Sequence, residues 1–194
     1  MIRTFAVAAL LIAFVPAHGQ DSPTPPAGWI AIFNGKDLSG WTPTGNPKVW
    51  GVEKGVLYVA GGGGGWLMTD KEYKNFEIKL DYKPTKHANS GVALRSPLPK
   101  DMKKGQGWDP AYAGMEIQLI DDEGWPGMLE KWQHTGSIYN VVPAAKVNPR
   151  PIGEWNTIHI TAKGPKIKIV HNDETLVDAD LTDYVKEHSA KHPG

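Results

Sequence analysis

The stretch FEIKLDYK, residues 76–83, alternates large apolar side chains with charged ones along its whole length. Successive side chains of a β-strand point to opposite faces of a sheet, so this pattern predicts a strand with one buried face and one face in water. An eight-residue strand of this kind needs a sheet around it and a second layer to cover its apolar face. The stretch therefore favours a fold built from packed sheets.

Shorter strand patterns lie on both sides of this stretch. Turn-type residues separate them, and the segments 53–55 (EKG) and 172–174 (NDE) have the composition of tight hairpin connections. The other predicted strands are 29–33, 49–52, 56–59, 91–96, 115–120, 136–141, 155–162, 167–171 and 176–179. About ten short strands without an internal repeat predict one sandwich-like all-β domain.

The composition agrees with such a domain and excludes several classes of protein. The chain has 22 Gly and 16 Pro, which disfavour long helices, and its 40% hydrophobic residues and eight Trp disfavour disorder. Lys and Arg number 21 and Asp and Glu 21, without a basic tract, so nucleic acid is a poor candidate partner. The absence of Cys excludes disulfides, thiol catalysis and zinc–thiolate sites.

The N-terminus has the pattern of a bacterial export signal. A basic start at Arg3 precedes an apolar run, and Ala17 and Gly19 are small residues at the positions that a signal peptidase reads. The run is shorter than the roughly 20 apolar residues of a membrane-spanning helix. The sequence therefore predicts a Sec-type signal peptide over residues 1–19, a Pro-rich linker over 20–27, and a periplasmic or secreted protein that is not inserted in the membrane.

Polar side chains are expected on the non-core faces of two of the predicted strands. In GVALRS, residues 91–96, the large apolar residues share one face, which places Ala93 and Arg95 on the other. In MEIQLI, residues 115–120, the same alternation leaves Glu116 and Gln118 side by side, about 6–7 Å apart. Such a face suits a concave binding surface, and an ordinary hydrated face with a Glu–Arg ion pair is the alternative.

An acidic run, Asp121-Asp122-Glu123, follows the second of these strands. Carboxylates in such a run could hold a divalent cation or cap a loop, and the pattern favours the loop. The sequence assigns no cofactor and leaves a divalent metal ion open.

The motifs of this chain, taken together, resemble a known family. GWIAIFNGKDLSGW, VWGVEKGVLYV, NSGVALR, MEIQLIDDE and HTGSIYN are similar, in this order, to the 3-keto-disaccharide hydrolases, also described as 3-keto-glucoside 1,2-lyases and 3-keto-2-hydroxy-glucal hydratases. The resemblance runs from about Gly28 to Asp183. It implies a single concanavalin A-like jelly roll over residues 28–194, with two antiparallel sheets and a concave sugar-binding face. It also implies export in bacteria that degrade glycosides after an oxidoreductase has made the 3-keto sugar.

One departure from the family pattern falls at the C-terminus. Family members continue past the region of Tyr184 into a segment of the type G-x-I-G-L-Q-x-H and a closing strand, whereas this sequence ends at Gly194. We therefore expect the domain to lack the closing strand of the family, and a lost strand exposes a sheet edge.

The substrate implied by the resemblance needs only one proton-abstracting group. A carbonyl at carbon 3 acidifies the proton on carbon 2, and a retaining glycosidase would instead need two carboxyl groups, where Gln118 cannot ionise. Glu116 or His134 is the candidate base, and Tyr139 or His134 is the candidate acid for the leaving group. Arg95 suits the enolate oxygen, because its guanidinium is always cationic.

Several neutral and aromatic residues complete the expected binding site. Asn89 and Gln118 are candidate hydrogen-bond donors, and Asp121 is a further candidate contact. Trp125 and Trp132 lie in the loop before His134, where their rings could stack on a pyranose or cover the edge of the core.

These observations favour an exported enzyme that cleaves 3-keto glycosides by elimination and hydration, with net hydrolysis and a small-molecule sugar as its partner. A non-catalytic carbohydrate-binding module is the alternative, because a jelly roll with an aromatic groove can bind glycans without chemistry.

Overall fold

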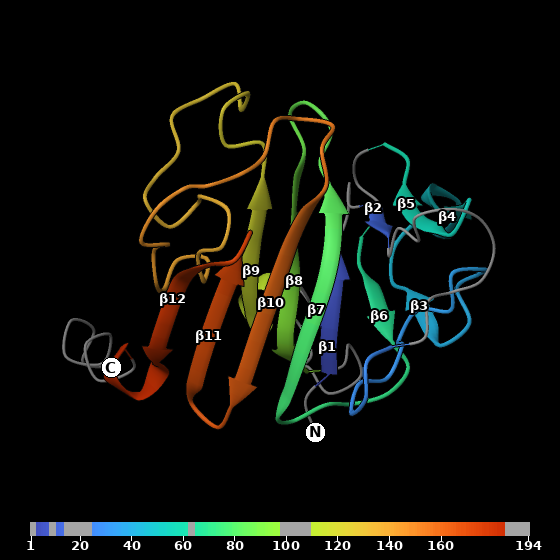
Figure 1. Ribbon diagram of the computed structural model, residues 1–194, viewed down its shortest axis with the longest axis horizontal. Helices are drawn as coiled ribbons and strands as arrows, with labels where there is room; N and C mark the ends of the chain where they lie inside the picture. The colour runs from blue at the N-terminus through green and yellow to red at the C-terminus, as the bar shows by residue number, and fades with distance from the viewer. Residues whose placement is uncertain (1–2, 8–10, 14–24, 62–64, 98–109, 185–194) are drawn as a thin grey trace, which may run out of the picture.

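The computed structural model describes residues 3–7, 11–13, 25–61, 65–97 and 110–184 of the 194-residue chain. These residues form two antiparallel sheets that pack face to face, with loops at both ends (Figure 1). The arrangement confirms the predicted all-β jelly-roll sandwich.

One sheet has five strands and lies behind the other in Figure 1. In order across the sheet, its strands are β3 (Trp41–Pro43), β6 (Leu67–Thr69), β1 (Arg3–Val7), β8 (Asn89–Ser96) and β9 (Met115–Ile120). A four-residue helix, α1 (Pro110–Ala113), leads into β9.

The second sheet has seven strands. In order, these are β12 (Glu174–Asp180), β11 (Lys166–His171), β10 (Asn156–Lys163), β7 (Phe76–Lys83), β2 (Leu11–Ala13), β5 (Val56–Val59) and β4 (Trp50–Glu53). A 3-10 turn, η1 (Pro47–Val49), precedes β4. The strand predicted over residues 76–83 is confirmed with the same bounds.

Both predicted hairpin connections are present. Lys54 and Gly55 join β4 to β5 with φ of 50° and 79°, and Asn172 and Asp173 join β11 to β12 with φ of 47° and 67°. Two consecutive residues with positive φ are typical of the two-residue turn whose twist matches a hairpin. Gly and Asn or Asp adopt this conformation at little cost, which explains why the composition identified these turns.

Two of the predicted strands are wrong, and two short strands after residue 40 were not predicted. Residues 29–33 form a turn and bends, because the Trp29 amide donates to the Pro26 carbonyl rather than to a neighbouring strand. Residues 136–141 run beside β9 without regular strand geometry. The strands β3 and β6 have three residues each, too few for an alternating pattern to stand out.

The predicted signal peptide also contributes strands. Residues 3–7 lie between β6 and β8, and residues 11–13 lie between β5 and β7, each paired antiparallel to its neighbours. The predicted cleavage position after Gly19 lies outside the described residues. None of the described helices has the length and hydropathy to cross a membrane.

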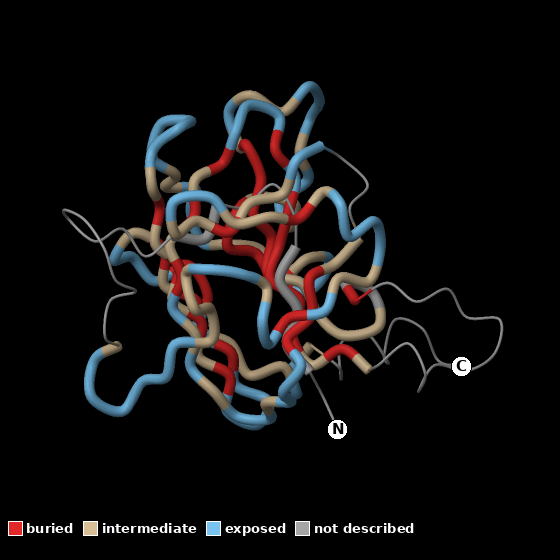
Figure 2. Tube along the Cα trace, turned by 90° about the vertical axis from the view of Figure 1, so that its right-hand side faces the viewer, coloured by how far each residue is buried: buried red, intermediate tan, exposed pale blue. Residues whose placement is uncertain are grey.

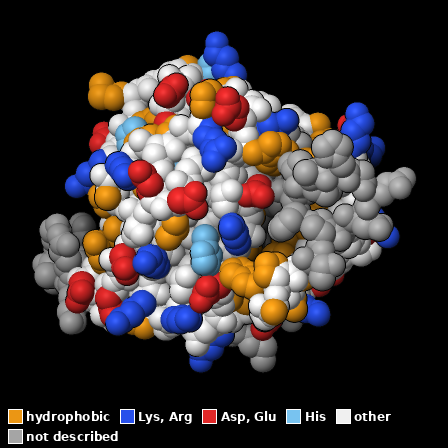
Figure 3. Space-filling model, viewed as in Figure 1, with side chains coloured by type: hydrophobic (Ala, Val, Ile, Leu, Met, Phe, Trp, Pro, Cys, Tyr) orange, Lys and Arg blue, Asp and Glu red, His pale blue; other side chains and the backbone are white. Residues whose placement is uncertain are grey.

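Burial follows the layers of the sandwich. Buried segments run through the interior between the sheets, whereas the loops and outer surfaces are exposed (Figure 2). On the outer face of the seven-stranded sheet, charges of both signs alternate (Figure 3), and Glu77 contacts both His159 and Lys163 at 3.2 Å. This face therefore offers no patch of one charge for a polyanion.

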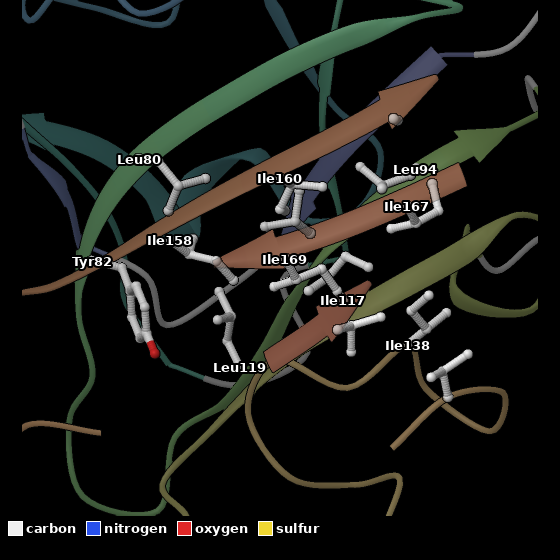
Figure 4. Packing of buried hydrophobic residues seen from close by; sticks show 14 residues of the cluster. Leu80, Tyr82, Leu94, Ile117, Leu119, Ile138, Ile158, Ile160, Ile167 and Ile169 are labelled. Atoms are coloured by element: carbon white, nitrogen blue, oxygen red, sulfur yellow. The ribbon is translucent and has the colours of Figure 1, made fainter. Parts of the chain in front are cut away.

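The core between the sheets is aliphatic. Side chains of β7, β10 and β11 pack against those of β8 and β9 (Figure 4), and the most completely buried members of this cluster are Tyr82, Leu94, Ile117, Leu119, Ile138, Ile158, Ile160, Ile167 and Ile169. Trp41 and Trp50 are buried in a second cluster, together with Leu57 and Leu67. Each such side chain contributes about 1.5–3 kcal/mol by leaving water.

A hydrogen-bonded histidine is buried at the margin of this core. The Asn148 side-chain amide donates to the His171 carbonyl at 2.9 Å, so its oxygen accepts from His171 Nδ1 at 2.7 Å. The other ring nitrogen, Nε2, therefore accepts the hydroxyl proton of Tyr82 at 2.8 Å. Burial is the main cause that lowers the pKa of His171 to about 4, and Arg150 is a smaller cause.

We expect His171 to make the fold sensitive to acid. The folded state keeps this imidazole neutral, whereas the unfolded chain protonates it near pH 6.5, so the unfolding free energy falls as the pH drops from about 6.5 to 4. The loss of unfolding free energy should approach about 3 kcal/mol, and the contribution of His171 should be constant above about pH 6.5. Urea unfolding across this range measures the slope. His171→Gln should be less stable at neutral pH and have a shallower slope, and equal slopes would contradict the assignment.

Candidate functional site

Glu116 and Gln118 lie on the face of β9 that points away from the core. Ile117 and Leu119, which alternate with them, are buried between the sheets. On the neighbouring strand β8, Ala93 pairs with Glu116, and Gly91 pairs with Gln118. The two polar residues therefore lie side by side on β9, as the sequence predicted.

Gly91 makes room for the carboxylate of Glu116. A Cβ atom at Gly91 would come within 2.2 Å of Glu116 Oε1 and 2.6 Å of its Cγ. The Glu116 side chain therefore leans across β8 over the one position that has no side chain. This contact fixes where the carboxylate lies on the sheet.

The segment after the acidic run extends this sheet by one irregular strand. The Tyr139 amide donates to the Glu116 carbonyl at 2.9 Å, and the Gln118 amide donates to the Ser137 carbonyl at 3.0 Å. These antiparallel bonds place Tyr139 directly beside Glu116, and the Tyr139 hydroxyl accepts from Gln133 Nε2 at 3.3 Å. The carboxylate and the phenol that the sequence selected are neighbours on one face.

His134 forms a dyad with Asp122 at the other end of this segment. His134 Nδ1 lies 2.9 Å from Asp122 Oδ1, which also accepts the Thr135 amide at 3.1 Å. The Asp122 side chain is 2% exposed and that of His134 is 29% exposed. The buried Asp122 carboxylate, bonded to Nδ1, fixes the orientation of the His134 ring and leaves Nε2 toward solvent. The sequence did not predict this positioning role of Asp122.

The two ends of the face are well separated. Thr135 binds the backbone of Ile120, and His134 binds Asp122, so His134 lies beyond the end of β9. Ile120 is four residues along β9 from Glu116, which at a strand rise near 3.3 Å per residue is roughly 13 Å between backbones. Gln133, the neighbour of His134 in the chain, nevertheless reaches the Tyr139 hydroxyl beside Glu116, so both Glu116 and His134 remain candidate bases.

Arg95 stands at a β-bulge. Between Ala93 and Ser96, β8 contains one residue more than its partner β1, and Arg95 has a φ of 55°. Positive φ at a non-glycine residue is strained, and bulges redirect side chains beside functional sites. The predicted alternation therefore holds through Leu94, which is buried in the core, and the bulge begins at the next residue, Arg95.

Four buried side-chain atoms have no protein partner among the described residues. Two of them are Arg95 Nη2 and Gln118 Oε1, and the others are Ser90 Oγ and Asp122 Oδ2. Burial also lowers the pKa of Arg95. Buried donors and acceptors are almost always paired in native proteins, so such atoms point to a polar ligand or water at this face. A sugar hydroxyl can serve as partner to Arg95 and Gln118.

Asp121 has a structural role. Its Oδ1 accepts the Gly124 amide at 2.9 Å and its Oδ2 accepts the His87 amide at 2.8 Å, while the residue is 1% exposed. Both oxygens thus cap the loop, which is the alternative that the pattern favoured over a divalent cation, and they are used for this rather than free for the predicted substrate contact. In the described part of the chain, no three Asp, Glu or His side chains come together as metal ligands.

The aromatic residues divide between the two ends of the face. Trp125 and Trp132 are half-buried in the loop before His134, where Lys131 Nζ lies 5.8 Å from the Trp132 ring. Trp66 packs with Met68 and Ala93. Ala93 pairs with Glu116 across β8 and β9, so Trp66 lies at the Glu116 end of the face. The sequence did not select Trp66, although alternation in Trp66-Leu67-Met68 could have placed it opposite the buried Leu67. Asn89 is exposed at the His134 end, in the pair position of Ile120.

A cavity lies elsewhere in the described chain. It has a volume of about 440 Å³ and lies beside β7, with Trp29, Tyr73 and Phe76 in its wall. None of the predicted site residues lines it. Residue chemistry, rather than cavity size, identifies the β8–β9 face as the candidate site.

Gly91→Ala tests the placement of Glu116. The new methyl group should displace the flexible carboxylate while leaving the strand intact, because Ala is no worse than Gly in a strand. We expect stability within about 0.5 kcal/mol of the parent and a loss of activity of about 10²-fold, as for a 1 Å misplacement. Thermal unfolding and steady-state kinetics measure the two. Unchanged activity would remove Glu116 from the chemistry.

Comparison with known proteins defines the class of this fold and site. Residues 28–193 match the family model of the 3-keto-alpha-glucoside-1,2-lyase-like domain. The match covers most of the chain, and the chain therefore belongs to this family. The resemblance of its motifs is thereby confirmed.

Individual relatives agree with this family. A 3-keto-disaccharide hydrolase of Bacteroides thetaiotaomicron is 29% identical over 171 residues, which are 79% of this chain and 59% of that protein. The chain thus spans about three fifths of the length of this relative. A candidate glycosyl hydrolase of Parabacteroides distasonis, solved by crystallography, is 32% identical with a TM-score of 0.71, over 82% of this chain and 76% of that one. A second structure of that description has 30% identity and a TM-score of 0.65, over 78% and 72% of the two chains.

Proposed function

We propose that this protein is an enzyme that cleaves 3-keto glycosides by elimination, followed by hydration of the product. Family membership supports the substrate class. The observation that carries the proposal is the position of one carboxylate, Glu116, beside the phenol of Tyr139 on the non-core face of β9. A 3-keto sugar needs one base and one acid, and this pair supplies both.

In the first step, the Glu116 carboxylate removes the proton from carbon 2 of the sugar. The carbon–hydrogen electrons form a double bond between carbons 1 and 2 as the bond from carbon 1 to the leaving oxygen breaks. Tyr139 donates a proton to that oxygen, which leaves as an alcohol. The product ring is a 3-keto-2-hydroxy-glucal, and addition of water across its double bond yields the free 3-keto sugar.

Arg95 stabilises the charge that develops on the oxygen at carbon 3. Its guanidinium is cationic at any working pH, and Nη2 is a buried donor without a protein partner in the described residues. The Gln118 side chain, level with Gly91 in the next pair position, supplies neutral hydrogen bonds. A conventional retaining glycosidase is disfavoured, because the position beside Glu116 is an amide and not a second carboxylate.

His134 serves a different part of the substrate in this proposal. His134 lies beside Asp122 beyond the end of β9, where it would contact the leaving portion of the glycoside, with Trp125 and Trp132 as stacking surfaces at that end. The Asp122–His134 dyad holds the imidazole for a hydrogen bond to a sugar hydroxyl.

Incubation with a glycoside and with its 3-keto counterpart tests the function. We expect turnover of the keto compound alone, with an absorbing enone or glucal intermediate under single-turnover conditions. Binding without turnover would favour the carbohydrate-binding module, and cleavage of the unoxidised glycoside would favour a conventional glycosidase.

We also propose that the protein is exported and processed after Gly19. The residue pattern of the N-terminus supports this proposal. The intact mass of protein recovered from the periplasm of a bacterial host should correspond to a chain that starts at Gln20. A mass that includes residues 1–19 would refute it.

A further inference from the structure

The side-chain amide of Gln133 is held in one orientation by the backbone of its own turn. The Gln133 backbone amide donates to the Glu130 carbonyl at 2.8 Å, and the Glu130 backbone amide donates in return to Gln133 Oε1 at 2.8 Å. A backbone N–H can only donate, so the side-chain atom that faces it is the carbonyl oxygen and not the nitrogen. The NH₂ group of Gln133 therefore points away from the turn.

This NH₂ group contacts the hydroxyl of Tyr139. Gln133 Nε2 lies 3.3 Å from the Tyr139 hydroxyl oxygen. An amide NH₂ group donates and does not accept, whereas a phenol can donate one proton and also accept. Tyr139 is therefore the acceptor in this pair, and its own proton is directed to a different acceptor.

The Tyr139 side chain lies on the same face as Glu116. Ile138 forms an antiparallel bridge with Ile117, and both side chains are fully buried in the core. Side chains alternate along the chain, so Tyr139 and Glu116, which are joined by a backbone hydrogen bond, project to the other side. The oriented phenol is thus on the face where the proposed reaction takes place.

His134, the alternative acid, is held in the opposite sense. Its Nδ1 lies 2.9 Å from the Asp122 carboxylate, which can only accept, so Nδ1 carries the proton. In a neutral imidazole, Nε2 is then an acceptor. Neutral His134 can therefore take a proton at this face but cannot give one, which leaves Tyr139 as the donor.

We propose that Gln133 is a positioning residue that makes Tyr139 the proton donor to the leaving group. In the elimination, the O–H bond of Tyr139 breaks as its proton passes to the leaving oxygen, which keeps the electron pair of its bond to carbon 1. The remaining phenolate accepts a charge-assisted hydrogen bond from Gln133 Nε2. In the hydration, the phenolate takes a proton from the water that adds to carbon 1, while Glu116 returns its proton to carbon 2. This inference rests on the proposed function and adds to it the group that orients the acid.

Gln133→Glu and Gln133→Leu distinguish this role from a structural one. Glutamate keeps the shape of the side chain and the bond from the Glu130 amide, but its second oxygen accepts from Tyr139 and draws the phenol proton to itself. Leucine loses both bonds and does not compete for the proton. Turnover of a methyl 3-keto glucoside should fall in the order Gln, Leu, Glu, with a loss of about 10²-fold or more for Gln133→Glu. A residue needed only for the turn would give the reverse order for Leu and Glu.

The leaving group and two further variants sharpen the test. A nitrophenolate leaves without a proton, so Gln133→Glu should change the turnover of a nitrophenyl 3-keto glucoside by less than about threefold. It should have no additional effect in a Tyr139→Phe background, where the acid is already absent. Asn140→Asp places the same charge on the exposed neighbour of Tyr139 and should leave both substrates unaffected.

Nuclear magnetic resonance measures the contact without substrate. The NH₂ resonances of Gln133 should shift in Tyr139→Phe, and the Glu130 amide resonance should keep its position in Gln133→Glu. Unshifted NH₂ resonances, equal losses on the two substrates, or lower turnover for Leu than for Glu would each overturn the inference. No turnover by the parent would refute the proposed function and this role with it, whereas parent turnover with an unaffected Gln133→Glu would refute this role alone.

Discussion

Glu116→Gln should lower the turnover of a 3-keto glycoside by about 10²–10⁴-fold, the range for loss of a general base. The amide preserves the shape of the side chain over Gly91 and removes only the ability to accept a proton. Fold stability should be unchanged. Steady-state kinetics, with thermal unfolding as the control, measure the two effects.

Exchange of the carbon-2 proton with deuterated solvent identifies the base directly. If Glu116 is the base, exchange should fall together with turnover in Glu116→Gln and survive in His134→Ala. If His134 is the base, the pattern should be reversed. Because Glu116 lies on β9 and His134 lies beyond the end of that strand, beside Asp122, the two variants report on different ends of the face.

Arg95→Gly should separate folding from activity. Glycine adopts the observed φ of 55° without strain, so the variant should be as stable as the parent or more stable by up to about 1 kcal/mol. Turnover should nevertheless fall by about 10²–10³-fold, the loss expected for one donor to a developing oxyanion.

Arg95→Lys is the conservative companion of this change. It retains the charge and loses the planar pair of donors, so its turnover should lie between those of the parent and Arg95→Gly. Equal activity of all three proteins would show that the guanidinium does not touch the reacting sugar and would favour the binding-module alternative.

The fold was predictable wherever side chains alternate over six or more residues. The eight residues of β7 are the clearest case, because Phe76 to Lys83 repeat every second position without a break. The three-residue strands β3 and β6 carry too little pattern to be distinguished from loops. The apolar run 29–33 misled because its residues cover the cavity beside β7 rather than pair with a strand.

The site was predictable where it depends on strand parity and unpredictable where it depends on contacts across loops. Parity placed Glu116 next to Gln118, as β9 shows. The dyad of Asp122 and His134 joins residues twelve positions apart, and no local pattern encodes that contact. The positive φ of Arg95 likewise could not be predicted, because it arises where β8 has one residue more than its partner β1.

That mismatch has an evolutionary consequence. The bulge in β8 is in effect a one-residue insertion, and deletion of Arg95 would restore a regular strand and relieve the strained φ. A lineage under selection for fold stability alone would therefore gain from losing this codon. We expect descendants of this chain that bind sugars without cleaving them to have a β8 one residue shorter, so that a simple count between Ala93 and Ser96 would separate enzymes from binding modules.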